Sequence, residues 1–232
     1  MLSHRQEKLI KSLHTEKGRE KAKLWLVEGM KCLESAGPAV QLRFGPEDSH
    51  HFTQLTTTDT PPSIAGLAVA PQFQLNDITT KKTILVLDHL QDPGNVGTII
   101  RLAKAFNAGL ILCECADPGN SKVIRSSAGL VFTTPWIIMS PQMVSEWLTE
   151  TDFIIYRLEN RRGAQELNAQ SSKFLSADKI IIVVGSEGQG IKLKVAGQAI
   201  AIQHDPSVDS LNVATAVAIA LFLRYQKNNN KL

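Results

Sequence analysis

The chain has 232 residues, of which 43% are hydrophobic and 20% are charged, and its formal net charge is +3. This composition is ordinary for a folded protein and excludes a disordered or collagen-like chain, while so small a net charge does not by itself indicate a nucleic-acid binder. A chain of this length can bury a large core, and we expect two unequal domains.

The sequence contains no apolar run that approaches the roughly 18 residues of a membrane span, and its first residues carry charges where a secretory leader is apolar. We therefore expect a cytoplasmic protein with no membrane partner. The three cysteines, Cys32, Cys113 and Cys115, lack the CxxC spacing of zinc sites, and their odd number argues against a disulfide framework. We predict reduced core thiols and no bound metal.

Basic residues concentrate in residues 1–31, where eight lysines and arginines stand against four glutamates. Such an excess can mark a surface that faces phosphates, because each basic side chain near a phosphate displaces counterions and adds affinity for nucleic acid. A solvated helix explains the same charges equally well, so both interpretations stay open.

The first part of the chain is predicted to form a small α/β domain. Leu9, Ile10 and Leu13 recur at helical spacing, which predicts an amphipathic helix from about Ser3 to Thr15. Strands are predicted at Leu24–Gly29, Val40–Phe44 and Ile64–Ala70, with a helix over residues 46–55.

A polar stretch from Ala70 to Lys82 has a proline and no clear periodicity, which predicts a linker. We place a first domain at residues 1–75, the linker at 76–82 and a second domain at 83–228.

The second domain alternates apolar runs with helical patterns. The predicted strands are Thr83–Asp88, Leu110–Glu114, Phe153–Leu158, Lys179–Gly185 and Ala199–Ile202, and the last helix runs from about Leu211 to Lys227. Continuous apolar runs are typical of parallel strands that are buried on both faces. The pattern predicts a parallel sheet covered by helices, with ligands bound at the carboxyl ends of its strands.

The first loop with candidate functional residues follows the strand at Thr83–Asp88 and has the sequence DPGNVGTIIR. Asp92, Pro93 and Gly94 form a turn, and Asn95 stands where a helix cap is expected, with Arg101 almost two turns later. Taken alone, the loop is explained equally well by a capped helix with a solvated arginine.

The second loop is GSEGQGI (Gly185–Ile191), directly after the most apolar strand. Its three glycines permit positive φ and allow a ligand to approach the backbone closely. The spacing matches neither a phosphate-binding Walker loop nor a GxGxxG fingerprint. A tight strand-to-helix turn is the alternative explanation, although the loop also places an acid, Glu187.

The third loop, SVDSLN, precedes the helix VATAVAIALFL, which is apolar on nearly every face. Such a helix belongs in a core or at a subunit interface. At the end of the chain it would expose much apolar surface in a monomer, so we expect a homodimer.

The stretches DPGNVGTIIR, GSEGQGI and SLNVATA, in this order, resemble the three motifs of the SpoU (TrmH-type) family of tRNA and rRNA 2′-O-methyltransferases in the SPOUT superfamily. SKVIRSSAGLVFTTPW resembles the family's RxSxG stretch. Upstream, LVEG and TDTPPSIAGLAV resemble the L30e-like RNA-binding domain of many members. The resemblance implies a parallel sheet with a C-terminal deep trefoil knot, and a homodimer that forms through the knotted region.

The resemblance also implies transfer of a methyl group from S-adenosylmethionine to a ribose 2′-hydroxyl of tRNA or rRNA. It assigns catalysis to Arg101, Asn95, Asn212 and Ser210, cofactor binding to Gly185, Glu187, Gly190, Ile202 and Leu211, and RNA contact to Arg125 and Ser127.

Some positions depart from the family pattern. Gln203 and His204 follow Ile202 where many members have proline and methionine, and Ala214 replaces a common serine. These changes affect the shape of the cofactor pocket more than its existence. Two alternatives stay open: an RNA-binding protein that kept the fold and lost catalysis, and a SPOUT enzyme that methylates an RNA base. The missing GxGxxG fingerprint disfavours a nucleotide-dependent dehydrogenase.

Overall fold

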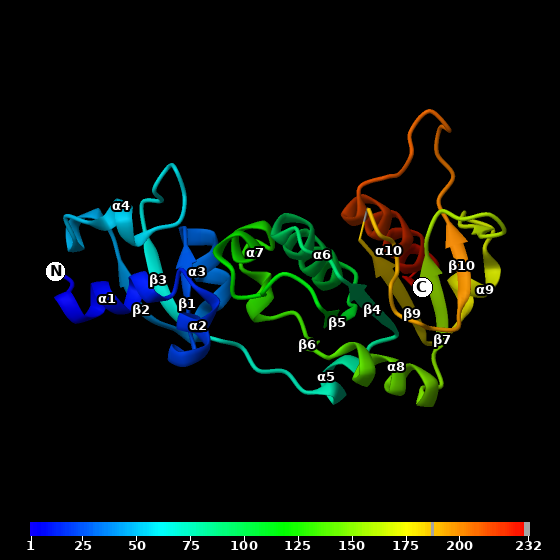
Figure 1. Ribbon diagram of the computed structural model, residues 1–232, viewed down its shortest axis with the longest axis horizontal. Coiled ribbons are helices and arrows are strands. Elements are labelled where there is room, and N and C mark those ends of the chain that lie inside the picture. The colour runs from blue at the N-terminus through cyan, green and yellow to red at the C-terminus, as the bar shows by residue number, and fades with distance from the viewer. Residues whose placement is uncertain (187, 230–232) are drawn as a thin grey trace.

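The structure is a computed structural model that describes residues 1–186 and 188–229. It contains a three-stranded sheet, formed by the N-terminal part of the chain, and a seven-stranded sheet, formed by the rest. Figure 1 shows an elongated molecule with the smaller sheet near one end and the C-terminal helix near the other.

The smaller sheet is antiparallel and has the strand order β1-β3-β2. Its strands confirm the three that the sequence predicts. They are β1 (Leu24–Glu28), β2 (Val40–Phe44) and β3 (Ala65–Val69). The helices of this part are α1 (His4–Ser12), α2 (Glu16–Ala22), α3 (Met30–Ala36) and α4 (Phe52–Leu55).

The first predicted helix is shorter than expected. It ends at Ser12, and Thr15 begins a second helix, because the Thr15 hydroxyl accepts a hydrogen bond from the Gly18 backbone N–H (3.1 Å). Threonine is a good N-cap for this reason, and α2 begins just after the end of the expected helix, where no helix was predicted.

Two other segments also differ from the expectation. Residues 46–55 form only a 3-10 turn and the short helix α4, because Ser49 between them is extended. Within the stretch predicted as linker, Leu75–Thr79 forms helix α5. Ile78 of this helix is fully buried, so the chain is anchored to the core directly before it enters the larger sheet.

The larger sheet confirms the predicted parallel arrangement, since every neighbouring pair of strands is parallel. The strand order is β6-β5-β4-β9-β7-β10-β8. The strands are β4 (Thr83–Asp88), β5 (Gly109–Cys113), β6 (Trp136–Ile138), β7 (Ile154–Leu158), β8 (Gln165–Glu166), β9 (Ile180–Gly185) and β10 (Gln198–Ala201). The two short edge strands, β6 and β8, were not predicted.

Side chains of the central strand β4 alternate between two covered faces. Leu85 and Leu87 belong to a core with the helices of one face, whereas Ile84 and Val86 pack with α5, α8 and residues 191–195 on the other. The helices of the first face are α6 (Pro93–Ala105), α7 (Ser121–Ser126), α9 (Ser172–Ser176) and α10 (Val213–Asn229), and α8 spans Pro141–Glu150. Burial on both faces explains the continuous apolar runs of β4 and β9.

The three cysteines are free thiols: Cys32 and Cys113 are buried and Cys115 is half-buried. Burial raises the pKa of Cys113 to about 12 and that of Cys115 to about 11. The part of the chain that the structure describes contains no helix suited to span a membrane and no group of three metal-ligating side chains.

Candidate functional site

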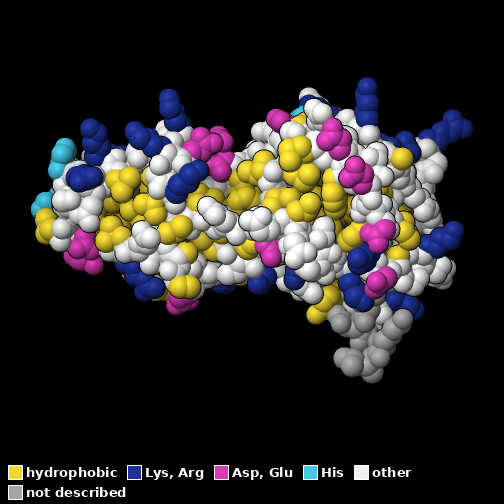
Figure 2. All heavy atoms as spheres, turned by 90° about the horizontal axis from the view of Figure 1, so that it is seen from below, with side chains coloured by type: hydrophobic (Ala, Val, Ile, Leu, Met, Phe, Trp, Pro, Cys, Tyr) yellow, Lys and Arg dark blue, Asp and Glu magenta, His cyan; other side chains and the backbone are white. Residues whose placement is uncertain are grey.

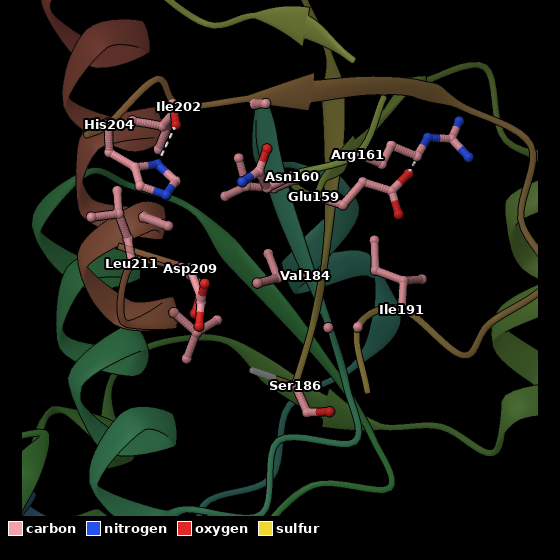
Figure 3. Close-up of a pocket in the computed structure, with 17 residues that line it drawn as sticks. Glu159, Asn160, Arg161, Val184, Ser186, Ile191, Ile202, His204, Asp209 and Leu211 are labelled. Carbon is pink, nitrogen blue, oxygen red and sulfur yellow. Dashed lines mark hydrogen bonds and ion pairs between the residues drawn. The ribbon is translucent and has the colours of Figure 1, made fainter. Parts of the chain in front are cut away.

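A cavity of about 350 Å³ opens where β7, β9 and β10 end and α10 begins. Val184, Ile202 and Leu211 supply aliphatic side chains to its lining, and Figure 3 shows them around one hollow. The carboxyl ends of parallel strands are the expected ligand position in such sheets, because the loops that leave them diverge there.

The loop after β9 turns back on itself at one wall of this cavity. The Gly190 N–H donates to the Ser186 carbonyl (2.8 Å), and Gly190 has a φ of +65°, which glycine adopts without strain. A Cβ atom on Gly185 would lie 2.1 Å from the carbonyl carbon of Gly190. Two glycines are therefore required for this close approach of backbone to backbone.

The structure brings together most residues to which the sequence assigned the cofactor. Gly185, Gly190, Ile202 and Leu211 line the cavity, together with Ser210, which was assigned to catalysis. Glu187 lies outside the described residues. Residues far apart in the sequence thus meet at one cavity because three strand ends and the start of α10 converge there.

Several polar residues of the lining, among them Glu159 and His204, were given no catalytic or binding role by the sequence. Glu159, directly after β7, is half-buried, and its carboxylate lies 3.2 Å from Nη2 of Arg157 and 3.0 Å from Nε of Arg161. His204 Nδ1 donates to the Ile202 carbonyl (2.9 Å). A carboxylate after a strand carries no sequence signal that would mark it, and His204 stood out only as a departure from the family pattern.

Asn95 and Asn212 meet beside the cavity although they belong to different motifs. Asn212 Nδ2 donates to Asn95 Oδ1 (3.0 Å). Asn212 Oδ1 accepts from the backbone N–H groups of Ala214 (3.0 Å) and Thr215 (3.2 Å), so the side chain also caps α10. The pair joins the first turns of α6 and α10, and Asn212 lies between two residues of the cavity lining.

The sequence suggested Asn95 as the helix cap of α6, but the cap is Asp92. Pro93 occupies the first helical position, and the Asp92 carboxylate accepts from the N–H groups of Gly94 (3.2 Å) and Asn95 (3.1 Å). Partial burial raises the pKa of Asp92, but hydrogen bonds from Lys122 and these two N–H groups outweigh it and hold the pKa below its usual range. Asn95 is thereby left in the first turn, with its side chain available to Asn212.

Arg101 lies further along α6 and its side chain is exposed. It does not line the cavity, and among the described residues no carboxylate forms an ion pair with it. A guanidinium in this condition can bind an anion that comes from another molecule.

Arg125 and Ser127 lie where α7 meets the smaller sheet. Arg125 forms an ion pair with the buried carboxylate of Glu28 and donates to the Thr57 hydroxyl (2.9 Å). Ser127 is fully buried, and its hydroxyl donates to the Ile124 carbonyl (3.0 Å). Arg125 thus joins α7 to the smaller sheet, whereas the hydrogen bonds of Ser127 are local, and contact of either residue with RNA stays a prediction.

The model of the SpoU rRNA Methylase family matches residues 82–222. The chain is 30% identical to the 23S rRNA (guanosine(2553)-2′-O)-methyltransferase RlmP of Bacillus subtilis, over 91% of this chain and 92% of that protein. A solved chain from Porphyromonas gingivalis, assigned to the TrmH family of RNA methyltransferases, is 26% identical, with a TM-score of 0.83 and coverage of 97% of this chain and 98% of that one. An AdoMet-bound rRNA methyltransferase from Sinorhizobium meliloti has the same fold, with 24% identity, a TM-score of 0.82 and coverage of 99% and 97%.

Proposed function

Because the chain belongs to the SpoU rRNA methylase family, we propose that it transfers a methyl group from S-adenosylmethionine to a ribose 2′-hydroxyl of tRNA or rRNA. The observation that carries this proposal is the cavity at the strand ends with the Asn95–Asn212 pair beside it. RlmP, which matches over nearly its whole length, is a ribose methyltransferase, and this supports ribose over a base.

The cavity fits the cofactor in size and in chemistry. Its volume of about 350 Å³ lies in the range of small-molecule pockets, roughly 300–1,000 Å³. Val184, Ile202 and Leu211 offer apolar contact to an adenine ring, while the carboxylate of Asp209 suits a ligand with positive charge. The carboxylate of Glu159 is already paired with Arg157 and Arg161. S-adenosylmethionine supplies an electrophilic methyl group on a positively charged sulfur.

The protein's own task is to present the ribose and to assist the loss of its proton. A ribose hydroxyl is a weak nucleophile near neutral pH, so position and proton removal decide the rate. Arginine remains protonated in proteins and is not an ordinary base. We propose that Arg101 binds an RNA phosphate and polarises the 2′-hydroxyl, while Asn95, Asn212 and Ser210 order the loops around the ribose.

We further propose that the C-terminal segment forms the deep trefoil knot that the resemblance implies. Strand β10 lies beyond β7 in the sheet, yet α10, which follows it, returns across β9 to pack on α6. The hydrogen bond between Asn212 and Asn95 connects the start of α10 to the first turn of α6. A chain that leaves β9 by a loop and comes back past that loop supports a threaded path.

We also propose that residues 1–75 form an L30e-like RNA-binding domain, that residues 76–82 link it to the methyltransferase domain at 83–228, and that the protein acts in the cytoplasm. Figure 2 shows lysine and arginine side chains along the edges of the N-terminal part, which supports contact with phosphates.

A homodimer is proposed from the exposed aromatic side chains of α10. Phe222 is 48% exposed and Tyr225 is 43% exposed, which leaves apolar surface on the last helix. We expect light scattering to give the mass of two chains, and Phe222→Asp to give the mass of one. A wild-type monomer would contradict the proposal.

The experiment that tests the function is incubation of the purified protein with radiolabelled S-adenosylmethionine and separated tRNA and rRNA from cells that lack the gene, followed by nucleoside analysis. We expect label in a 2′-O-methylnucleoside. Label in a methylated base would favour the base-methylating alternative, and failure to bind S-adenosylmethionine would favour the RNA-binding protein without catalysis.

A further inference from the structure

Asp88 is the last residue of β4, and its side chain is fully buried. It pairs with Gly185, the last residue of β9, in the register of the sheet. One carboxylate oxygen, Oδ2, accepts hydrogen bonds from the backbone N–H groups of Lys192 (2.5 Å) and Leu193 (2.8 Å). A buried carboxylate is tolerated only where such donors replace its water, so its position is closely tied to this segment.

The segment that Asp88 holds continues the loop after β9 (Gly185–Ile191), here called the cofactor loop. Gly190 and Ile191 line the cavity, and the chain then passes Lys192 and buries Leu193 against the sheet. Because Lys192 directly follows the lining, a shift at its N–H would move one wall of the cavity. Asp88 itself does not line the cavity and acts on it only through this backbone.

The other carboxylate oxygen of Asp88 contacts the start of the loop between β4 and α6. The Nδ1–H of His89 donates to Oδ1 (2.5 Å), and His89 has a φ of +58°, in the left-handed region. From there the chain runs through the buried Leu90 to Asp92, which caps α6. One carboxylate therefore contacts both the loop beside the cofactor cavity and the loop that leads to Asn95.

We propose that Asp88 is a positioning residue that fixes the backbone at Lys192 and Leu193 against the end of β4, so that cofactor affinity depends on a carboxylate outside the cavity. This inference rests on the proposed function. A role in stability alone would reduce the fraction of folded protein but leave the affinity of the folded molecules unchanged, and this difference decides the test.

The experiment is isothermal titration of the full chain with S-adenosylmethionine, which reports the fraction of competent sites and their dissociation constant separately. We expect Asp88→Ala to raise the dissociation constant about tenfold or more, because two hydrogen bonds to a charged group are lost. Asp88→Asn keeps a carbonyl oxygen for Lys192 and Leu193, and its dissociation constant should lie between those of Asp88→Ala and wild type. An unchanged dissociation constant in Asp88→Ala would overturn the proposal.

His89→Gly is the matched control, because it removes the other contact of the same carboxylate and glycine tolerates the positive φ. We expect its dissociation constant to stay within about twofold of wild type. An increase equal to that of Asp88→Ala would show that the loop at Lys192 is not the part that matters, and would overturn the proposal.

Hydrogen exchange without cofactor tests the contact independently of the proposed function. The amides of Lys192 and Leu193 should be protected in wild type and exchange faster, by about tenfold or more, in Asp88→Ala. Unchanged exchange would overturn the role of Asp88 even in a protein that binds S-adenosylmethionine. Wild-type protein that shows this exchange pattern but binds no S-adenosylmethionine would contradict the proposed function and keep the structural part of the inference.

Discussion

The cavity at the ends of β7, β9 and β10 combines aliphatic and polar side chains with close backbone, whereas the neighbouring surface at α6 presents the exposed guanidinium of Arg101. Between them lies the hydrogen-bonded pair of Asn95 and Asn212. A small cofactor can be enclosed and held by shape, but a ribose within a large RNA must reach the site from an open surface. The difference predicts that substitutions on the two sides affect different steps.

The largest effect is expected from Arg101→Ala. Loss of a charged group that stabilises the reacting centre should lower methyl transfer about 100-fold or more, while the dissociation constant for S-adenosylmethionine stays within about twofold. Lys104→Ala on the same helix is the control, because Lys104 is exposed and, among the described residues, donates only to the Thr133 carbonyl. Single-turnover transfer and titration measure the two quantities. Undiminished transfer by Arg101→Ala would remove the proposed role.

The next effect concerns the ion pair between Glu28 of β1 and Arg125 of α7, which joins the N-terminal part, proposed to bind RNA, to the rest of the chain. Glu28 is 3% exposed and holds Arg125 and the Thr57 hydroxyl. Glu28→Ala should lower the free energy of unfolding by about 2 kcal/mol, since Arg125 retains access to water. Urea unfolding measures this. Affinity for RNA should fall while affinity for S-adenosylmethionine is retained. A loss of cofactor affinity alone would contradict the division of the site into a cofactor side and an RNA side.

Gly185→Ala tests the cofactor side. The added Cβ would meet the backbone of Gly190, which has little room to move, and affinity for S-adenosylmethionine should fall about tenfold. Gly188→Ala is the matched control within the same loop, because its Cβ would meet no atom within 4 Å. Titration calorimetry compares the two. Equal affinities of the two variants for S-adenosylmethionine would show that the close approach of Gly185 to Gly190 does not shape the cofactor site.

The smallest effect is expected from Asp209→Asn, which removes an exposed negative charge from the cavity lining. It should weaken S-adenosylmethionine about twofold and leave the uncharged-sulfur product S-adenosylhomocysteine unchanged, because exposed charges contribute little in water. Competition binding with the two ligands measures the ratio. A larger loss for the product would exclude a charge effect.

In the larger sheet, the strands buried on both faces could be predicted from sequence, and the two strands at its edges could not. The apolar runs of β4 and β9 have only one stable environment, the centre of a covered parallel sheet. The edge strands β6 and β8 have three and two residues, too few for a periodic signal. Helix α5 escaped prediction because a single buried residue, Ile78, anchors it within a polar stretch.

The candidate site divides in the same way. Glycines and polar residues after strands indicated the loops, and the family resemblance assigned the cofactor to Gly185, Ile202 and Leu211, which line one cavity. The contact between Asn95 and Asn212 joins residues 117 positions apart, and no local pattern encodes such a pairing. Asp88 was read only as the end of a strand, because its hydrogen bonds reach residues more than 100 positions away.

The most direct test of the account is a crystal structure of the protein grown with S-adenosylmethionine. We predict electron density for the cofactor in the cavity, in contact with Gly185, Ile202 and Leu211, and beside the Asn95–Asn212 pair. Density for the cofactor at any other place, or a cavity that stays closed to it at saturating concentration, would contradict the division of the site into an enclosed cofactor side and an open RNA side.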